Sequence, residues 1–304
     1  MTRQRQYWVA EFLGKLENMD LEIKRFPEDE DYIKIGNGDV TDFNFLVGRL
    51  KIRNLERGDQ QMFETVYVQF LNSGQTFDLL LLPPQLVSDY ERLINNTDNN
   101  FSLGYKANLT DVWGKGFDTE GRRDRAWIFH SNKTLGSARE FTQAYLGTRR
   151  IYRKGEHWKF LVRGEVGYTQ ASVDNLDIDF GIGDGPVRVS VTELPSFYRF
   201  KAGGSESVRG YGFETLSNND IGSNHIITAS IEVERRVFRR WSAAAFFDIG
   251  NAFNEWKDPD LRKGAGFGIR WYSIAGPVSL DYARALDVAG KPWRIHFTIG
   301  TPLL

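Results

Sequence analysis

The chain has 304 residues, a formal net charge of −1 and no cysteine. The near-neutral charge gives no electrostatic reason to expect a nucleic-acid partner, and the lack of cysteine excludes disulfides, thiolate metal sites and a cysteine nucleophile. Aromatic residues make up 14% of the chain, yet no apolar run approaches the roughly 20 residues of a membrane-spanning helix, so helical spans are excluded.

The N-terminal third shows only partial strand patterns. Its first residues, "MTRQRQYWVAEFLG", are basic but lack the continuous apolar core of a secretory signal. We therefore expect either that a signal was removed or that the chain is the end of a longer precursor. Alternation of apolar and polar residues is typical of strands, and here it predicts strands near 5–17, 20–26, 30–36, 43–54, 60–71 and 75–83.

From residue 100 onward the alternation is regular. In "WRIHFTIGT", Trp293, Ile295, Phe297 and Ile299 fall on one face of a strand, and polar or small residues fall on the other. The same pattern predicts strands near 100–112, 121–131, 138–153, 156–170, 224–238, 240–254, 262–274, 276–285 and 293–301.

Long strands that begin or end in aromatic residues favour an all-β fold, a transmembrane antiparallel β-barrel with an apolar exterior and a polar lumen. A soluble barrel or sandwich is the alternative. The fifteen predicted strands imply about sixteen, because bacterial barrels have an even number. The tight turns "RKGEH" and "FRRW" belong on one, periplasmic, side, so we expect residues 171–223 to form a single long extracellular loop that includes "VRVSVTELPSFYRF".

Strand parity predicts which side chains face the lumen. Glu232 and Glu234 alternate with Ile231 and Val233, and Asp248 alternates with its apolar neighbours in the same way. We therefore expect an acidic inner wall at these positions. The complete prediction places Glu232, Glu234, Asp248, Arg270, Asp281 and Arg294 in the lumen, and Trp241, Phe267, Trp271, Trp293, Ile295 and Phe297 against lipid.

Four segments occur in a recognisable order: "FKAGGSESVRGYGFETL", "SIEVE", "FFDIGNAF" and "GAGFGIRWYSIAGPVSLDYA". Together they resemble the C-terminal barrel of the outer-membrane assembly superfamily that contains BamA, TamA and the two-partner secretion transporters. The resemblance is strongest from about Lys115 to Leu304 and is closest to TamA, although BamA-like chains usually end on an aromatic residue. Family members carry POTRA domains before the barrel, and we expect none within residues 1–304, which we interpret as one barrel domain.

The resemblance implies that the long loop folds back into the lumen as a lid whose arginine, here Arg209, meets the acidic wall. An arginine offers five donors in a rigid fork and keeps its charge, so it can bridge two carboxylates. Gly210 lets the backbone turn beside it, and Val208 and Tyr211 give the tip apolar surface. Two interpretations stay open: a contact that only stabilises the barrel, and a lid that moves.

By the same resemblance, the chain helps to insert unfolded outer-membrane proteins, such as autotransporters, through a lateral gate between its first and last strands. The alternative is a secretion pore of the two-partner type that conducts a polypeptide through the lumen. Implied partners are membrane lipids, client proteins and a TamB-like periplasmic protein, in the outer membrane of a Gram-negative bacterium. No nucleophile with a base emerges, and no histidine pair has metal-ligand spacing, so we expect no enzyme, metal or cofactor.

Overall fold

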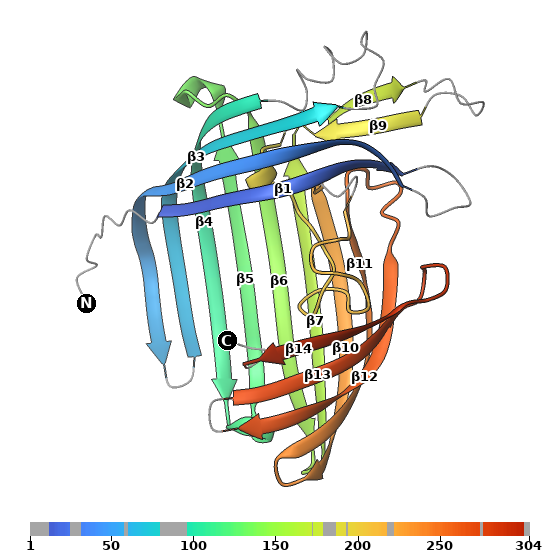
Figure 1. Cartoon of the computed structure of the whole chain (residues 1–304). Coiled ribbons are helices and arrows are strands. Elements are labelled where there is room, and N and C mark those ends of the chain that lie inside the picture. The colour runs from blue at the N-terminus through green and yellow to red at the C-terminus, as the bar shows by residue number, and fades with distance from the viewer. Residues whose placement is uncertain are drawn as a thin grey trace.

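The computed structural model describes residues 12–24, 32–57, 60–79, 96–171, 173–178, 187–192, 194–217, 222–273 and 276–300. Within them, twelve strands form one curved antiparallel sheet (Figure 1). They are β1 (Phe12–Lys24), β2 (Tyr32–Arg57), β3 (Gln60–Leu79), β4 (Asn96–Trp113), β5 (Glu120–Ser131), β6 (Phe141–Lys154), β7 (Trp158–Gln170), β10 (His225–Phe238), β11 (Trp241–Phe253), β12 (Arg262–Ser273), β13 (Gly276–Ala285) and β14 (Trp293–Ile299).

The sheet follows chain order, except that β7 pairs with β10 across the long loop. Inside that loop, β8 (Val173–Ile178) and β9 (Val187–Thr192) form a separate two-stranded hairpin. Short 3-10 turns occur at η1 (Gly116–Asp118), η2 (Lys133–Leu135) and η3 (Ser196–Tyr198). No helix among the described residues is long and apolar enough to cross a membrane.

The all-β prediction is confirmed, and the described residues form twelve strands in the main sheet where about sixteen were expected. Three pairs of predicted strands are single strands: 5–17 with 20–26, 30–36 with 43–54, and 60–71 with 75–83. The residues between these predicted strands, such as "GNGD" in β2 and "NSG" in β3, stay extended because adjacent strands pair with them. The part of the first predicted strand that precedes Phe12 lies outside the described residues.

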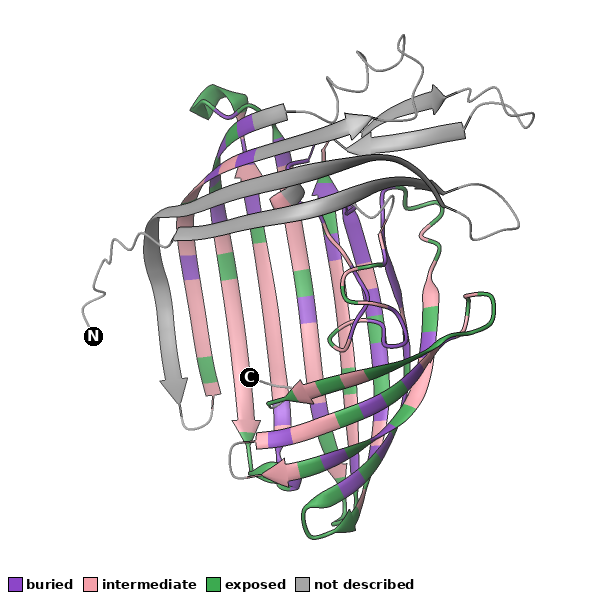
Figure 2. Ribbon diagram, viewed as in Figure 1, coloured by how far each residue is buried: buried purple, intermediate pink, exposed green. Residues whose placement is uncertain are grey.

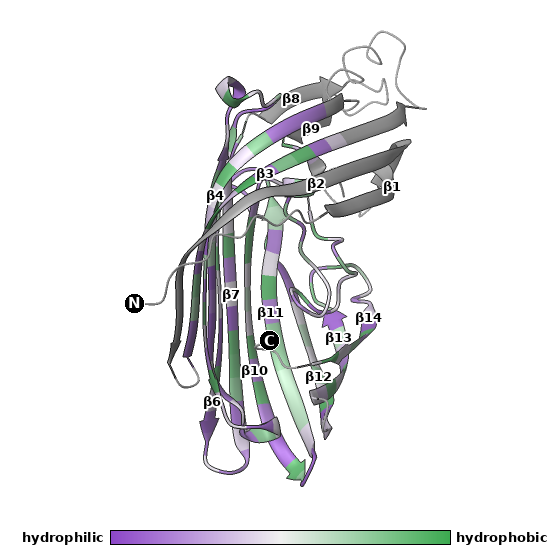
Figure 3. Ribbon diagram, turned by 90° about the vertical axis from the view of Figure 1, so that its left-hand side faces the viewer, coloured by the Kyte–Doolittle hydropathy of each residue, from purple (hydrophilic) through white to green (hydrophobic). Residues whose placement is uncertain are grey.

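Burial along the strands is inverted relative to a water-soluble sheet. In β11, exposed and buried residues alternate from Trp241 to Asp248 (Figure 2). The exposed positions carry only apolar side chains, whereas the buried positions carry Ser242 and Asp248 together with Ala244 and Phe246. Hydrophobic and hydrophilic residues alternate along the upright strands as well (Figure 3). Outward aromatic residues such as Phe267, which is 59% exposed, confirm the predicted lipid-facing set, whereas Glu232, Asp248, Arg270 and Asp281 are buried inside.

The two tight turns lie at the same end of the sheet, as predicted. Arg236 N donates to the His157 carbonyl across them at 2.8 Å. The connection between β7 and β10 therefore leaves from the opposite end, and "VRVSVTELPSFYRF" adds no strand to the main sheet, although its first residues form β9.

This inverted pattern predicts a depth-dependent cost for outward charges. Replacing Phe267, in the middle of β12, by Lys should lower the free energy of unfolding by about 2–4 kcal/mol, because an ammonium group would face acyl chains. The same change at Phe238, the last residue of β10, should cost about 0–1 kcal/mol. Denaturant unfolding in lipid vesicles measures both values, and equal losses would contradict a lipid-facing β12.

Candidate functional site

The loop before β10 turns back into the concave side of the sheet (Figure 1). We call residues 194–217 the lid. Two antiparallel bridges shape it: Ala202 N donates to Leu216 O at 2.8 Å, and Phe200 N donates to Ser223 O at 2.8 Å. Its base is held by Tyr198, whose carbonyl accepts a 2.7 Å hydrogen bond from the Gln143 amide of β6. The lid is thus an ordered loop with a fixed base.

The tip of the lid packs as a small hydrophobic core. Val208 is fully buried and clusters with Tyr211 of the lid, Ile226 of β10, Ala252 of β11 and Ala285 at the end of β13. Burial raises the pKa of the Tyr211 hydroxyl to about 12, with a further contribution from Asp287. Val208 and Tyr211 therefore anchor the tip between the wall strands.

Two glycines permit this close approach. Gly210 has φ +97°, and a Cβ built there would lie 2.7 Å from the Ala285 backbone nitrogen. On the wall, a Cβ at Gly264 of β12 would lie 1.9 Å from the Arg209 carbonyl oxygen. The lid backbone therefore rests directly on the backbone of β12 and β13, where no side chain could be accommodated.

The guanidinium of Arg209 lies buried among carboxylates from three strands. Its Nε and Nη2 donate to Asp248 of β11 at 2.7 and 2.9 Å, and its Nη1 donates to Glu232 of β10 at 2.6 Å and to Asp281 of β13 at 3.2 Å. Burial disfavours the charged form, but Asp248, Glu232 and Asp281 outweigh it and raise the pKa of Arg209 above its ordinary value. Arg209 is therefore held in its charged form.

Arg270 of β12 completes the ion cluster. Its Nη2 donates to Glu232 at 2.7 Å and its Nη1 donates to Asp281 at 2.5 Å, so each of these carboxylates lies between two arginines. Arg163 of β7 lies 3.9 Å from Asp248. Three arginines thus face three carboxylates, and this balance is what makes their burial tolerable.

Phe246 provides a surface under the arginine. The Arg209 Cζ lies 3.4 Å from the Phe246 ring centroid, a cation-π contact. Gly266, directly opposite on β12, leaves room for the ring, since a Cβ there would lie 2.6 Å from Phe246 Cζ. The alternate glycines of "GAGFGIR" therefore serve both the lid and the side chain beneath it.

Glu234 does not reach Arg209. Two residues further along β10, it accepts hydrogen bonds from Ser242 and Tyr272 and lies 3.8 Å from Lys159 Nζ. The Lys159 ammonium lies 4.7 Å from the ring of Phe117, which belongs to the turn between β4 and β5. Glu234 thus belongs to a second inner cluster, nearer the tight turns.

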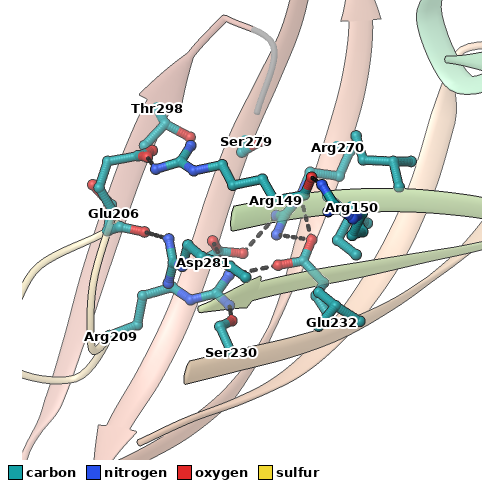
Figure 4. Close-up of a pocket in the computed structure, with 15 residues that line it drawn as sticks. Arg149, Arg150, Glu206, Arg209, Ser230, Glu232, Arg270, Ser279, Asp281 and Thr298 are labelled. Atoms are coloured by element: carbon teal, nitrogen blue, oxygen red, sulfur yellow. Dashed lines mark hydrogen bonds and ion pairs between the residues drawn. The ribbon is translucent and has the colours of Figure 1, made fainter. Parts of the chain in front are cut away.

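Further contacts fix the flank of the lid. Glu206 Oε2 accepts from Arg149 Nη2 of β6 at 2.6 Å, and the Ser205 and Ser207 carbonyls accept from Arg163 at 3.3 and 2.5 Å. A pocket of about 90 Å³ lies here (Figure 4). Its lining includes Arg149, Arg163, Ser205, Glu206, Arg209, Glu232, Arg270 and Asp281. The lid therefore contacts β6 and β7 as well as the strands from β10 onward.

The last strand is also tied to the lid. Gly210 N donates to His296 Nε2 of β14 at 2.9 Å, and His296 is directly opposite Asp281 in the pairing of β13 and β14. The contact was not anticipated from the sequence, in which the histidines suggested only solvated or lumen-facing side chains. Strand parity predicted that Arg270 and Asp281 face the lumen. It gave no sign that Arg270 and Arg209 both donate to Glu232 and Asp281.

Among known families, a model of the Omp85 superfamily domain matches residues 49–302. The solved structure of BamA from Haemophilus ducreyi lacking POTRA domains 1–3 has a TM-score of 0.55 at 16% sequence identity. The match covers 94% of this chain and 62% of that one, so this chain spans less than two thirds of the length of the BamA structure. This likeness supports the fold.

A second solved structure is CdiB from Acinetobacter baumannii. It matches with a TM-score of 0.34 at 11% identity, over 94% of this chain and 65% of that chain.

The shared carboxylates predict a coupled loss of stability. Arg209→Ala should cost about 3–5 kcal/mol of unfolding free energy because it leaves buried carboxylates unpaired. Asp248→Asn should also destabilise, and the double variant should lose less than the sum, since both changes remove one interaction. Arg262→Ala, which breaks a partly exposed pair with Asp260, is the control at about 1 kcal/mol or less. Strictly additive losses in denaturant titrations would contradict the shared contact.

The close backbone approach predicts that one methyl group displaces the lid. Gly264→Ala would place its Cβ on the Arg209 carbonyl, so the lid tip should leave the wall and trypsin should cleave after Arg209 more rapidly. Gly164→Ala on β7 is the matched control, because its Cβ would meet nothing closer than 3.8 Å. A lid that resists trypsin equally in both variants would show that the tip does not rest on Gly264.

Proposed function

This chain belongs to the Omp85 superfamily, and on that basis we propose that it inserts client proteins into the outer membrane of a Gram-negative bacterium through an opening at the edge of its sheet. A client strand pairs with β14, extends the sheet and is then released sideways into lipid. This is β-strand addition, in which backbone hydrogen bonds supply the affinity. The proposal assigns no catalysis to the chain.

The observation that carries this proposal is the free edge at β14. In the described part of the chain, β1 and β14 are the two outer strands of the sheet, and β14 pairs only with β13. It has seven residues, and its outward side chains Ile295, Phe297 and Ile299 are 61–69% exposed. In a membrane, unpaired backbone groups are costly, so an edge of this kind favours the addition of another strand.

The lid supports the proposal by fixing the position of that edge. Arg209 joins carboxylates of β10, β11 and β13, and Gly210 reaches β14 through His296. These contacts link the edge strand β14 to β10, β11 and β13. In the docked state they present β14 in one orientation, as a template for an incoming strand requires.

The second candidate is passage of an unfolded chain along the inner face, as in a secretion pore. The observation that favours it is the polar inner wall, with charged residues such as Arg149, Arg163 and Glu165. On this interpretation the lid is a plug that must leave before transport. A disulfide that joins β1 to β14 separates the two proposals, because it should stop insertion and leave transport through the lumen intact.

Site-specific crosslinking tests where a client binds. A photoreactive residue at Ile295, on the edge strand, should capture a client during assembly, because the client strand pairs beside it. The same residue at Ile231, which is also outward and 57% exposed but lies on the central strand β10, is the control. Equal capture at both positions, or capture only at inner positions, would contradict insertion at β14.

A further inference from the structure

Three arginines stand side by side on one row of the inner wall. Arg123 of β5 is directly opposite Arg149 of β6, and Arg149 is directly opposite Arg163 of β7. Like charges in direct cross-strand pairs are destabilising. A row of this kind therefore calls for a counter-charge.

The row belongs to the concave face. Arg123 and Arg125 share a strand face with Trp127, whose ring stacks on Phe200 of the lid at 6.1 Å. Arg122 lies on the opposite face and is 3.8 Å from Asp111. We define the arginine row as the three cross-strand arginines, Arg123, Arg149 and Arg163, together with Arg125, which lies two residues along β5 from Arg123 on the same face. The row is thus turned away from the lipid-facing surface.

The lid satisfies only half of the row. Glu206 pairs with Arg149 at 2.6 Å, and two main-chain carbonyls of the lid accept from Arg163. Burial alone would raise the pKa of Glu206, but Arg149 and Arg163 lower it below its ordinary value. Within the described residues, Arg123 and Arg125 have no hydrogen-bond or ion-pair partner.

The neighbouring acid on the wall does not compensate for the row. Glu165 lies two residues along β7 from Arg163, but its two oxygens accept from Tyr145 at 2.7 Å and from Thr228 at 2.7 Å. The row therefore keeps two free guanidinium groups while the lid is docked. Arg149 loses its ion pair with Glu206 when Glu206 leaves, whereas Arg163 still has Asp248 at 3.9 Å.

We propose that the arginine row binds acidic segments of a polypeptide on the inner face. In the docked lid, Glu206 occupies the position that a carboxylate of such a segment would take. The docked occupant is itself a polypeptide that presents one carboxylate and two carbonyl oxygens to the row. An acidic segment supplies the same groups and reaches Arg123 and Arg125 as well. This proposal rests on the proposed function in one respect, namely that unfolded clients reach this face. It adds that the arginine row recognises acidic segments of those clients.

A binding measurement on the folded chain in phosphatidylcholine nanodiscs tests this. The probe is a short fluorescein-labelled peptide in which glutamate alternates with serine, and its glutamine counterpart is the reference. Anisotropy should show binding of the glutamate peptide alone. Glu206→Gln should tighten binding, because it removes the competitor, and Arg123→Gln with Arg125→Gln should weaken it about tenfold or more. Because neither arginine has a hydrogen-bond or ion-pair partner among the described residues, their removal leaves no acceptor unpaired, and the double variant should fold.

Arg122→Gln is the control for the single variant Arg123→Gln, since each removes one charge from β5 and the two residues lie on opposite faces. Equal weakening by Arg122→Gln, equal binding of the glutamine peptide, or weaker binding in Glu206→Gln would each overturn the proposal. Displacement of the peptide when phosphatidylglycerol is added to the nanodisc would instead assign the row to lipid phosphate. Peptide binding is measured without client assembly, so its failure is separable from failure of the crosslinking at Ile295.

Discussion

The buried guanidinium of Arg209 is the constraint around which the inner wall is arranged. A charge inside a protein is tolerated only where opposite charges and hydrogen bonds replace water. Here Asp248, Glu232 and Asp281 do so, each from a different strand, and Arg270 and Arg163 balance the remaining charge. The arginine reaches these acids only if its backbone lies on the wall. Gly264 leaves room for that backbone, and the ring of Phe246 contacts the guanidinium.

This arrangement connects the lumen to the membrane-facing edge. The outer surface of the described strands is mainly apolar, and in the proposed function a client meets the backbone at β14 and the polar inner face. The lid contacts both. It touches β6 and β7 through Arg149 and Arg163 and touches β14 through His296, so one loop spans the distance between the arginine row and the edge strand proposed to receive a client.

The sequence predicted the inner wall better than the strand count. Alternation assigns a residue to one of two faces, and it placed Asp248, Arg270 and Asp281 correctly. It does not report how adjacent strands are staggered, so it could not distinguish Glu232, which meets Arg209, from Glu234, which meets Lys159 and Tyr272. Interrupted alternation within β2 and β3 led to the prediction of two strands in place of each one, because pairing with adjacent strands is invisible in the sequence.

The lid is attached to its surroundings with unequal strength. Toward β10, β11 and β13 it has charge-assisted hydrogen bonds between buried groups, but toward β14 it has, among the residues that the structure describes, one hydrogen bond from Gly210 to an imidazole. A force that pulls the last strand outward therefore breaks the weakest link first. The mechanical consequence is an order of rupture: β14 separates from the lid while the lid remains seated, and the wall that guides the strand keeps its shape under load.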